Sequence, residues 1–466
     1  MLIKTRRDFL KIGLRSASAV GALGAMGRLG QINALAASNP NPNYNTYSAL
    51  VCIFMSGGND GGNTIVPIDT AGYNAYSASR LSLALPKATL LPIATSAQGN
   101  FGLYPKMPEL QGLYNTGKCA ILANVGMLVQ PVADKNVYNQ WASNGSNLPV
   151  NLFSHSDQSS QWQNTAPTGI SPNGWGGRLA DYMQSTPNAG AQFPAVVTTG
   201  GCGPFCTGSS TLPTVVPPGG AVPVTGNGSD PARVNAFQQL LTFDNGLQLV
   251  QTANGIVGRG AGYVNALNGL LAAQPALATP FPAGPDGSPN PLADQLKMVA
   301  RIISVHAGLG LNKQIFFCNF GGFDTHGGQA AIQDVLLQEL SQAMAAFYDA
   351  TVELGVASQV TAFTSSEFGR TLMPNSSGGT DHAWGNHHFI VGGAVKGGNM
   401  YGAYPALSLN SSLDATGRGS IIPTTSVEQY GATLAQWFGV DPTPAVMSQI
   451  FQNVGNFPTS NLGIMR

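Results

Sequence analysis

The sequence predicts an α/β protein built around a mostly parallel central sheet. Residues 49–55 and 119–125 are uninterrupted apolar runs bounded by turn residues, which is the pattern of strands buried on both faces. Residues 314–319, 329–354 and 360–364 follow one another as a strand, a helix with one apolar stripe and a second strand. A strand, a helix and a strand in this order form a parallel βαβ unit. These observations favour one large sheet with helices on its faces.

The other segments continue this alternation. Helices are predicted at residues 174–183, 233–271, 291–308 and 427–438, and strands at residues 193–198 and 389–393. Residues 199–230 are rich in Gly and Pro and have no helical period, so we expect a surface insertion that covers a site. We expect residues 37–466 to form one domain, with the Gly/Pro-rich insertion or cap region at residues 199–290.

The first residues resemble a signal for twin-arginine export. Arg6 and Arg7 precede a weakly hydrophobic stretch at residues 12–35, and small residues typical of a cleavage site follow. Glycines, serines and arginines interrupt this stretch, which makes it poor material for roughly 20 residues of membrane-spanning helix. We therefore expect residues 1–36 to be a bacterial twin-arginine signal peptide and the twin-arginine translocase to be a transient partner. The mature chain is expected to be periplasmic or secreted, with no stable membrane anchor.

The charge balance argues against some partners. The chain has 21 basic and 21 acidic residues, and loss of the leader leaves 15 basic and 20 acidic ones. A net charge of about −5 without blocks of Lys and Arg argues against nucleic acid or an anionic membrane as the main partner. Five cysteines remain, so at least one thiol is unpaired. Cys202 and Cys206 flank a short Gly-rich loop, and the sequence leaves open whether they form a local disulfide or stay free.

Histidines are concentrated in three short polar segments beside apolar runs. Five of the six lie there, accompanied by Asp324, Glu367 and Asp381, and they are His155, His326, His382, His387 and His388. Only 9% of the residues are charged, so this concentration is typical of a metal site rather than of a solvated surface. Imidazoles and carboxylates favour zinc as the divalent metal, with manganese, iron or calcium as alternatives.

These acids and histidines also follow or flank predicted strands. Because ligands in open α/β sheets bind beyond the carboxyl ends of the strands, loops that are distant in sequence are expected to meet there. The predicted metal ligands are Asp60, Asp324, His326, Glu367, Asp381, His382 and His387.

Three of these assignments have alternatives. Asp60 lies in a Gly-rich loop and suits a turn. Glu367 has Arg370 nearby as a possible structural partner. His387 and His388 face opposite ways in an extended chain, so we expect only one of them to be a ligand.

Several motifs together resemble a known family over essentially the whole mature chain. They are SGGNDGGNTIVP, SHSDQSSQW, GGFDTHGGQ, SEFGRT, GGTDHAWGNHHFIVGGAVKGG and EQYGATLAQWFGV. The chain resembles the bacterial domain-of-unknown-function family number fifteen hundred and one, of the alkaline phosphatase and sulfatase-like superfamily. The resemblance implies an alkaline-phosphatase-like three-layer sandwich with metal ions at the carboxyl ends of the central strands. The metal ligands that the resemblance implies are Asp60, Asp324, His326, Glu367, Asp381, His382 and one of His387 and His388.

The resemblance also bears on the reacting group. The superfamily nucleophile starts a helix after the second strand, where Ser154 and Ser156 are the nearest candidates, beside His155. Two features depart from the superfamily. The usual Asp-x-x-x-His spacing is shortened to Asp-x-His at Asp324 and His326, and the sulfatase motif Cys-x-Pro-x-Arg is absent. Formylglycine-type sulfatase chemistry is therefore not expected.

The sequence thus predicts an exported, metal-dependent hydrolase of phosphate or sulfate esters with a small-molecule substrate. A bound cation would lower the pKa of water or of Ser156 and neutralise the ester oxygens. Arg370 is expected either to clamp the leaving oxyanion or to pair with Glu367. The catalytic candidates are Ser154, His155, Ser156 and Arg370. The alternative is a secreted, non-catalytic binding or assembly protein that retains the fold.

Overall fold

The computed structural model describes residue 36 and residues 39–94, 97–169, 171–221, 223, 230–243 and 246–466. Its centre is a nine-stranded sheet with the order β11-β5-β10-β9-β1-β8-β6-β7 and with β12 beside β5. The strands are β1 (Ser48–Met55), β5 (Cys119–Gly126), β6 (Val196–Thr198), β7 (Thr214–Val215), β8 (Lys313–Phe320), β9 (Val360–Ser365), β10 (Asn386–Gly392), β11 (Met400–Gly402) and β12 (Thr425–Ser426). All pairings are parallel except the two made by β10, which confirms the predicted α/β fold with a largely parallel central sheet.

The central strands form because both faces of the sheet are covered. Every residue of β1, β5 and β9 is buried, as expected for apolar runs inside a parallel sheet. Val51 of β1 lies between Phe316 of β8 and Ala362 of β9. Fully burying a side chain of this kind contributes about 1.5–3 kcal/mol. These neighbouring strands therefore anchor the edge at which the functional loops begin.

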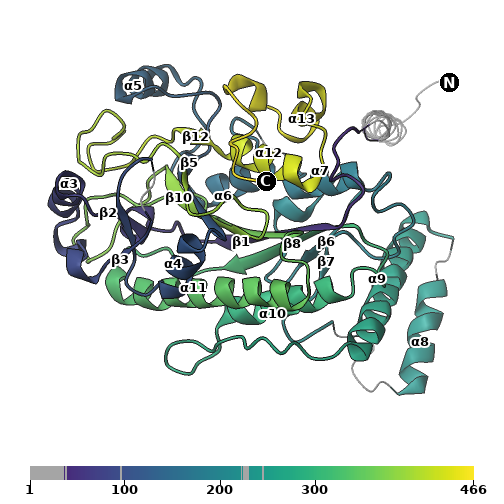
Figure 1. Ribbon diagram of the computed structural model, residues 1–466. Helices are drawn as coiled ribbons and strands as arrows, with labels where there is room; N and C mark the ends of the chain where they lie inside the picture. Colours follow the sequence, from purple (N-terminus) through teal and green to yellow (C-terminus); the bar gives the residue numbers. More distant parts are fainter. Residues whose placement is uncertain are drawn as a thin grey trace, which may run out of the picture.

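Helices on both faces complete a three-layer sandwich (Figure 1). One face is covered by α4 (Pro108–Asn115), α10 (Pro291–Ser304) and α11 (Gln329–Glu353). The other is covered by α6 (His155–Asn164), α7 (Trp175–Met183), α12 (Val427–Phe438) and α13 (Pro444–Ile450). The predicted βαβ unit is β8-α11-β9, and β1 lies between its two strands.

A smaller layer follows β1 in the chain. It contains α2 (Gly61–Thr64), β2 (Ile65–Pro67), α3 (Thr70–Arg80), β3 (Leu91–Pro92) and β4 (Phe101–Leu103). The order β2-β4-β3 forms a three-stranded antiparallel sheet. A further helix, α5 (Lys135–Asn144), precedes α6.

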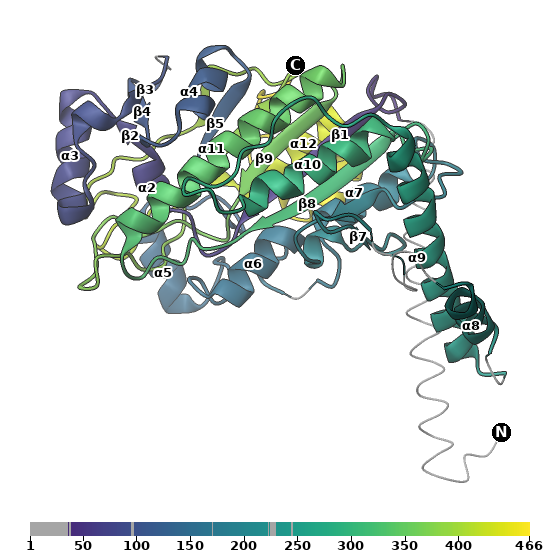
Figure 2. The same ribbon diagram turned by 90° about the horizontal axis from the view of Figure 1, so that it is seen from below.

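The segment at residues 199–290 differs in two ways from the sequence prediction. Its strand β7 joins the edge of the main sheet by pairing with β6. The single helix predicted at 233–271 is instead two helices, α8 (Pro231–Thr242) and α9 (Gln248–Ala273). The break coincides with the sequence Phe-Asp-Asn-Gly-Leu at 243–247, which is rich in turn-forming residues. Figure 2 shows both helices projecting from the end of the molecule opposite α2 and α3.

Two sequence expectations concern the chain as a whole. The predicted signal peptide lies outside the described residues, apart from Ala36. Within the described part of the chain, no helix combines the length and the apolar character needed to cross a membrane. All five cysteines are free thiols, with Cys202 exposed and Cys206 buried, so the structure shows the free-thiol alternative for this pair.

A buried lysine lies at the start of β8. Lys313 is 1% exposed, and its Nζ donates to the backbone oxygen of Asn43 at 2.6 Å and to Ser48 Oγ at 2.7 Å. Burial lowers the pKa of Lys313 to about 7, from an ordinary value of 10.5. Between these two pH values the folded protein binds less of this proton than the unfolded chain does. The stability of the fold therefore rises with pH over this window.

We expect Lys313→Met to remove this pH dependence. For the unchanged protein, the free energy of unfolding gains at most about 1.4 kcal/mol per pH unit between about pH 7 and pH 10 from this group. Urea unfolding at several pH values in the window measures the slope. Lys297→Met, at an exposed position of α10, is the control and should keep it. Equal slopes in the Lys313 variant and the unchanged protein would refute the assignment.

Candidate metal centre

A cluster of ionisable side chains lies where β8 and β9 end. It consists of His155 in the first turn of α6, Asp324 and His326 after β8, Glu367 and Arg370 after β9, and Asp381 and His382 before β10. β1 separates β8 and β9 in the sheet, and all three strands run in the same direction. The loops that follow them therefore meet at one edge, as the sequence predicted for these residues.

Three imidazole nitrogens surround one oxygen of Asp324. Its Oδ1 atom lies 3.3 Å from His155 Nε2, 3.2 Å from His326 Nε2 and 3.5 Å from His382 Nε2. The Nε2 atoms of His326 and His382 are 2.9 Å apart. Ligands bound tetrahedrally at about 2.0–2.1 Å from a zinc ion are separated by about 3.3–3.4 Å. The ligand atoms of His155, Asp324 and His382 all lie within 4.8 Å of one another, so these three residues could hold a metal ion, and His326 Nε2 lies beside Asp324 and His382.

The other ring nitrogen of each histidine is held by an oxygen. In sequence order, the three Nδ1 atoms lie 2.8 Å from Oε1 of Glu367, 3.3 Å from Oδ1 of Asp381 and 2.7 Å from the backbone oxygen of Phe153. An imidazole that donates from Nδ1 keeps the lone pair of Nε2 free. Histidines that bind metals are usually held in this way. Glu367 and Asp381, which the sequence predicted as ligands, are thus placed behind the histidines as acceptors.

Arg370 fixes the position of Asp324. Its guanidinium is fully buried and donates to three backbone oxygens and to Asp324 Oδ1. Burial alone would raise the pKa of Asp324, but the hydrogen bond and charge of Arg370, together with the nearby histidines, lower it to about 2. Asp324 therefore remains a carboxylate at neutral pH. The structural partner of Arg370 is Asp324, and the predicted pairing with Glu367 is not observed.

Glu367 is buried and only partly satisfied. Its Oε1 accepts hydrogen bonds from the backbone N–H of Gly57, at 2.8 Å, and from His155. Its Oε2, like His155 Nε2, has no hydrogen-bond partner among the described residues. The hydrogen bond that His155 donates to Glu367 raises the pKa of His155, whereas burial lowers the pKa of His382. Unpartnered buried polar atoms are costly, so an imidazole nitrogen left free in this place suits a cation.

We expect Glu367→Gln to weaken zinc binding by about 10–100-fold, the usual effect of losing the acceptor behind a metal-binding histidine. The amide no longer supplies the charge that orients His155 and raises its basicity. Competition with a chromophoric chelator measures the change in affinity. Glu353→Gln is the control, because that carboxylate lies on α11 and binds Ala278 and Thr279 instead. An unchanged zinc affinity in the Glu367 variant would contradict its role.

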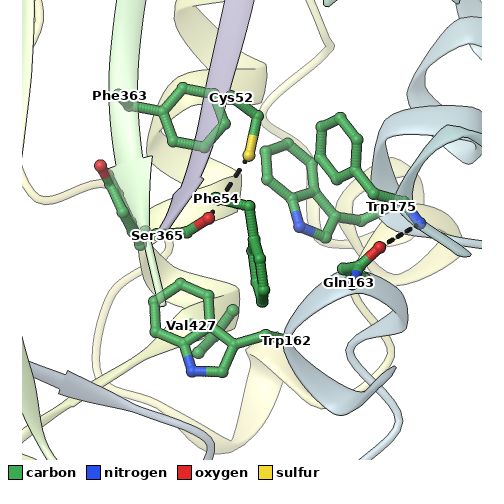
Figure 3. Close-up of a pocket in the computed structure, with 11 residues that line it drawn as sticks. Cys52, Phe54, Trp162, Gln163, Trp175, Phe363, Ser365 and Val427 are labelled. Carbon is green, nitrogen blue, oxygen red and sulfur yellow. Dashed lines mark hydrogen bonds between the residues drawn. The ribbon is translucent and has the colours of Figure 1, made fainter. Parts of the chain in front are cut away.

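The body of α6 is held in an aromatic layer that positions His155. Figure 3 shows Phe54 of β1 between Ser365 of β9 and Trp162 of α6, around a small buried pocket. On the next residue of α6, Gln163 Oε1 accepts a hydrogen bond of 3.3 Å from a backbone N–H in the loop after β6. Trp162 lies two helical turns after His155. A shift of α6 would disrupt this packed layer. The packing therefore keeps His155 in place.

Asp60 is engaged elsewhere. It is fully buried and forms an ion pair with Arg80, and its Oδ2 also accepts from Gln329 Nε2 at 2.5 Å. Its Oδ1 caps α2 by accepting from the backbone N–H of Asn63. The structure therefore does not bring Asp60 into the cluster, in contrast to the sequence prediction, because these partners occupy both oxygens.

His387 and His388 also lie outside the cluster. Both are buried on β10, where His387 Nδ1 accepts from the backbone N–H of Asn124 at 2.9 Å and its ring stacks on Tyr404. His388 packs edge-on against Trp162. Burial lowers the pKa of both histidines to about 3. The structure thus does not bring His387, the predicted ligand, or His388 to the cluster, because the strand buries both rings against other partners.

Ser154 and Ser156 bond within the start of α6. Ser154 is the N-cap residue, and its Oγ donates to Asp157 Oδ2 at 2.6 Å. The Oγ atom of Ser156 lies 3.2 Å from that of Ser154 and 3.4 Å from Asp157 Oδ2. The helix start at which the sequence analysis placed a nucleophile is present. The side chain that faces Asp324 from this helix start is that of His155.

The mixed α/β fold and the histidine–carboxylate cluster define a class of protein with a candidate metal centre beyond a parallel sheet. A family model described as "Protein of unknown function (DUF1501)" matches residues 295–449. This match confirms the family resemblance expected from the sequence over that segment. The segment contains Asp324, His326 and His382, and it begins well after His155 in the sequence. No curated protein matches the chain.

Several solved structures are similar to the chain at low identity. Ps i-CgsB in complex with k-i-k-neocarrahexaose is 7% identical, with 87% of this chain and 74% of that chain covered and a TM-score of 0.34. The PsFucS1 sulfatase from Pseudoalteromonas sp. is 10% identical, with coverages of 90% and 75% and a TM-score of 0.30. The phosphonate monoester hydrolase of Agrobacterium radiobacter is 9% identical, with coverages of 84% and 74% and a TM-score of 0.32.

Proposed function

We propose that this protein is a metal-dependent hydrolase of phosphate or sulfate esters. The observation that carries the proposal is the convergence of three Nε2 atoms on Asp324 Oδ1, with the Nδ1 atom of each histidine facing an oxygen acceptor. The proposed ligands are His155, Asp324, His326 and His382. Glu367, Asp381 and Arg370 hold them in place.

The donor set narrows the choice of metal. Three imidazole nitrogens and one carboxylate oxygen suit zinc, manganese or iron, whereas calcium prefers a shell made of oxygen ligands. Zinc is the first choice, because imidazole nitrogens together with a carboxylate oxygen are its usual ligands. A divalent cation bound here would polarise an ester oxygen and lower the pKa of a nearby water molecule.

The charge around the centre favours an anionic substrate. Arg418 Nη1 lies 2.7 Å from Asp381 Oδ2, so two guanidiniums and three carboxylates surround the proposed ion. With a divalent cation, the centre carries a net charge of about +1, which attracts a phosphate or sulfate ester. Asp324 and His326 are 49% and 46% exposed, which leaves one side of the centre open to a small molecule.

The proposal assigns no nucleophilic role to the serines at the start of α6. Both hydroxyls are engaged with Asp157 or with each other. We assign the attack on the ester to water, and Asp324 and the three histidines would hold a cation that lowers the pKa of this water. Arg370 is a positioning residue in this scheme, because its guanidinium is buried behind Asp324.

The experiment combines metal analysis with a turnover assay. We expect about one zinc, manganese or iron ion per purified chain, and hydrolysis of an aryl phosphate or an aryl sulfate. His326→Ala should lose both the metal and the turnover, and Ser156→Ala should keep both. A metal-free protein would overturn the proposal. A metal-loaded protein that hydrolyses neither ester class would favour a binding protein.

We also propose that the protein reaches the periplasm or the exterior through the twin-arginine translocase. The Arg6-Arg7 pair and the small residues after the leader support this route. This translocase carries folded cargo, so a metal ion can be inserted before export. The partners in this proposal are the translocase during export and a small-molecule ester. Neither nucleic acid nor a stable membrane anchor is part of it.

The alternative of a secreted binding or assembly protein is favoured by one observation. The helices α8 and α9 project from the body and expose large apolar side chains. Such a surface is typical of association with another macromolecule. A partner bound to this surface would not block the metal centre, because the surface and the metal centre lie on different elements.

A further inference from the structure

The projecting helices form an arm with little support from the rest of the chain. We use "arm" for the described residues 231–243 and 246–266, which comprise α8, the part of α9 before Leu267 and the described residues between the two helices. No residue of α8 is buried, and in α9 only Leu267 and Leu271, in its last turns, are buried. Figure 2 shows α8 and the start of α9 standing clear of the sheet and its covering helices. The arm is therefore anchored at one end only.

The surface of the arm is apolar. Its large exposed side chains are between 36% and 83% exposed, and they are Val234, Leu240, Phe243, Leu247, Leu249, Ile256 and Val257. Leu249 has the highest exposure of these residues. A helix as short as α8 is marginal in water when it does not pack on other elements. A partner that covers these side chains would stabilise the arm.

The exposed area is of the size that a dimer requires. At roughly 150–200 Å² for each large apolar side chain, the seven residues leave on the order of 700 Å² uncovered. A standard protein interface buries about 800 Å² on each partner. The largest apolar patch of an ordinary monomer is about 300–600 Å². The exposed apolar area of the arm is thus larger than the largest apolar patch of an ordinary monomer. It is close to the area that one partner buries in a dimer.

The charge pattern argues for a protein partner rather than a lipid surface. Between residues 231 and 273 the sequence contains Arg233, Asp244 and Arg259 as its charged residues, and it contains no Lys or Trp. Helices that lie on membranes carry a face rich in Lys and Arg, with aromatic residues such as Trp or Phe on the other. The centres of protein interfaces, in contrast, are depleted of charge.

The same chain offers a receptor for the arm. A groove of about 620 Å³ lies between α9 and the β7 edge of the sheet, and Leu212 and Val215 in its wall are 58% and 54% exposed. Ile256 and Tyr263 of α9 form the opposite wall. The lining of the groove also includes Arg259 of α9. An apolar arm and the apolar part of this groove on one chain are complementary between two copies related by a two-fold axis.

The dimensions allow this exchange. With 26 residues, α9 is about 39 Å long, and the groove lies against its middle part. Two α9 helices packed antiparallel would bring Leu249 of one copy close to the groove of the other. Gly260 lines the groove and leaves this part of α9 without a side chain, which permits close approach.

We propose that the arm is a dimerisation element, and that the arm tip of each copy packs into the groove beside β7 of a second copy. The tip residues are Leu240, Phe243, Leu247 and Leu249. The inference is independent of the proposed hydrolase function, because it uses none of the residues of the metal centre.

Sedimentation velocity of the purified full-length chain tests the proposal. We expect a dimer at about 50 µM protomer. The double variant Leu240→Glu with Leu249→Glu should raise the dissociation constant by more than about 100-fold, because charges are then buried in the interface. Val352→Glu is the matched control, since Val352 is 53% exposed on α11 and lies outside the arm, and it should leave the dimer intact.

Hydrogen exchange of α8 provides a second measurement that does not depend on the variants. Its amides should become more protected as the concentration of the unchanged protein rises. A monomer at about 50 µM would overturn the proposal, and so would a dimer that survives the double variant. A monomer that sediments with neutral phosphatidylcholine vesicles would overturn it in favour of a lipid surface.

Discussion

His155→Ala is expected to leave the purified protein without stoichiometric metal. The substitution removes one of four converging ligand atoms and deprives the buried Glu367 of its imidazole partner. Losing an acceptor behind a ligand typically weakens metal binding 10–100-fold, so loss of a ligand should exceed about 100-fold. Competition titration with a chromophoric chelator, at a pH where the unchanged protein is loaded, measures the effect.

The result distinguishes two roles for His155: the metal ligand that we propose from the structure, and the catalytic residue beside a nucleophile that the sequence suggested. If His155 only marked a nucleophile loop, its loss would lower turnover and spare metal binding. Two controls are available. Ser156→Ala changes the neighbouring residue, and His306→Ala removes the sixth histidine, which stacks on Tyr47. Both should bind zinc with unchanged affinity. Metal binding by His155→Ala equal to that of the unchanged protein would exclude His155 as a ligand.

Arg80→Met is expected to cost about 3–5 kcal/mol of unfolding free energy, because it leaves the carboxylate of Asp60 buried without its counter-charge. Arg80 also donates to Asn63 and to the backbone oxygens of Thr371 and Leu372, so the loss spreads through the small layer around α2 and α3. Urea unfolding measures the change. The folded fraction should retain its full metal content, because Asp60 is not a ligand.

A second variant identifies the cause of the loss. Adding Asp60→Asn to Arg80→Met removes the unpaired charge and should recover part of the stability, so the two changes are not additive. A loss below about 1 kcal/mol for Arg80→Met would show that the pair has little structural weight. Loss of metal from protein that remains folded would return Asp60 to the set of ligands.

The central strands and the helix between them could be predicted from the sequence because their signals are local. β1, β8 and β9 are short apolar runs with turn residues after them, and a strand buried on both faces has few other solutions. The 3.6-residue period of α11 likewise appears in a single window. β7 gave no such signal, because two residues at a sheet edge carry no periodicity.

The cluster was predicted in part for the same reason. Residues that directly follow strands, such as Asp324 and His326, reach the strand ends whatever the details of packing. The roles of the other residues depend on contacts between distant segments. Glu367 faces His155 across 212 positions of sequence, and Asp60 meets Arg80 in a fully buried pair. Nothing in the neighbouring residues distinguishes such acceptors and ion pairs from ligands.

The geometry also explains why the sequence alone did not place His155 among the candidate ligands. A histidine at the first position of a helix, between two serines, has no pattern that marks a ligand. The ring of His155 is held by its hydrogen bond with Glu367 and by packing against Phe368 and His382. That information belongs to the tertiary structure.

The most direct test is anomalous diffraction from crystals of the metal-loaded protein, with data collected on both sides of the absorption edge of zinc and, if needed, of manganese or iron. We predict one strong peak at about 2.0–2.2 Å from His155 Nε2, His326 Nε2, His382 Nε2 and Asp324 Oδ1. A metal peak beside Asp60 or His387, or a loaded crystal with no peak among these four atoms, would contradict the account.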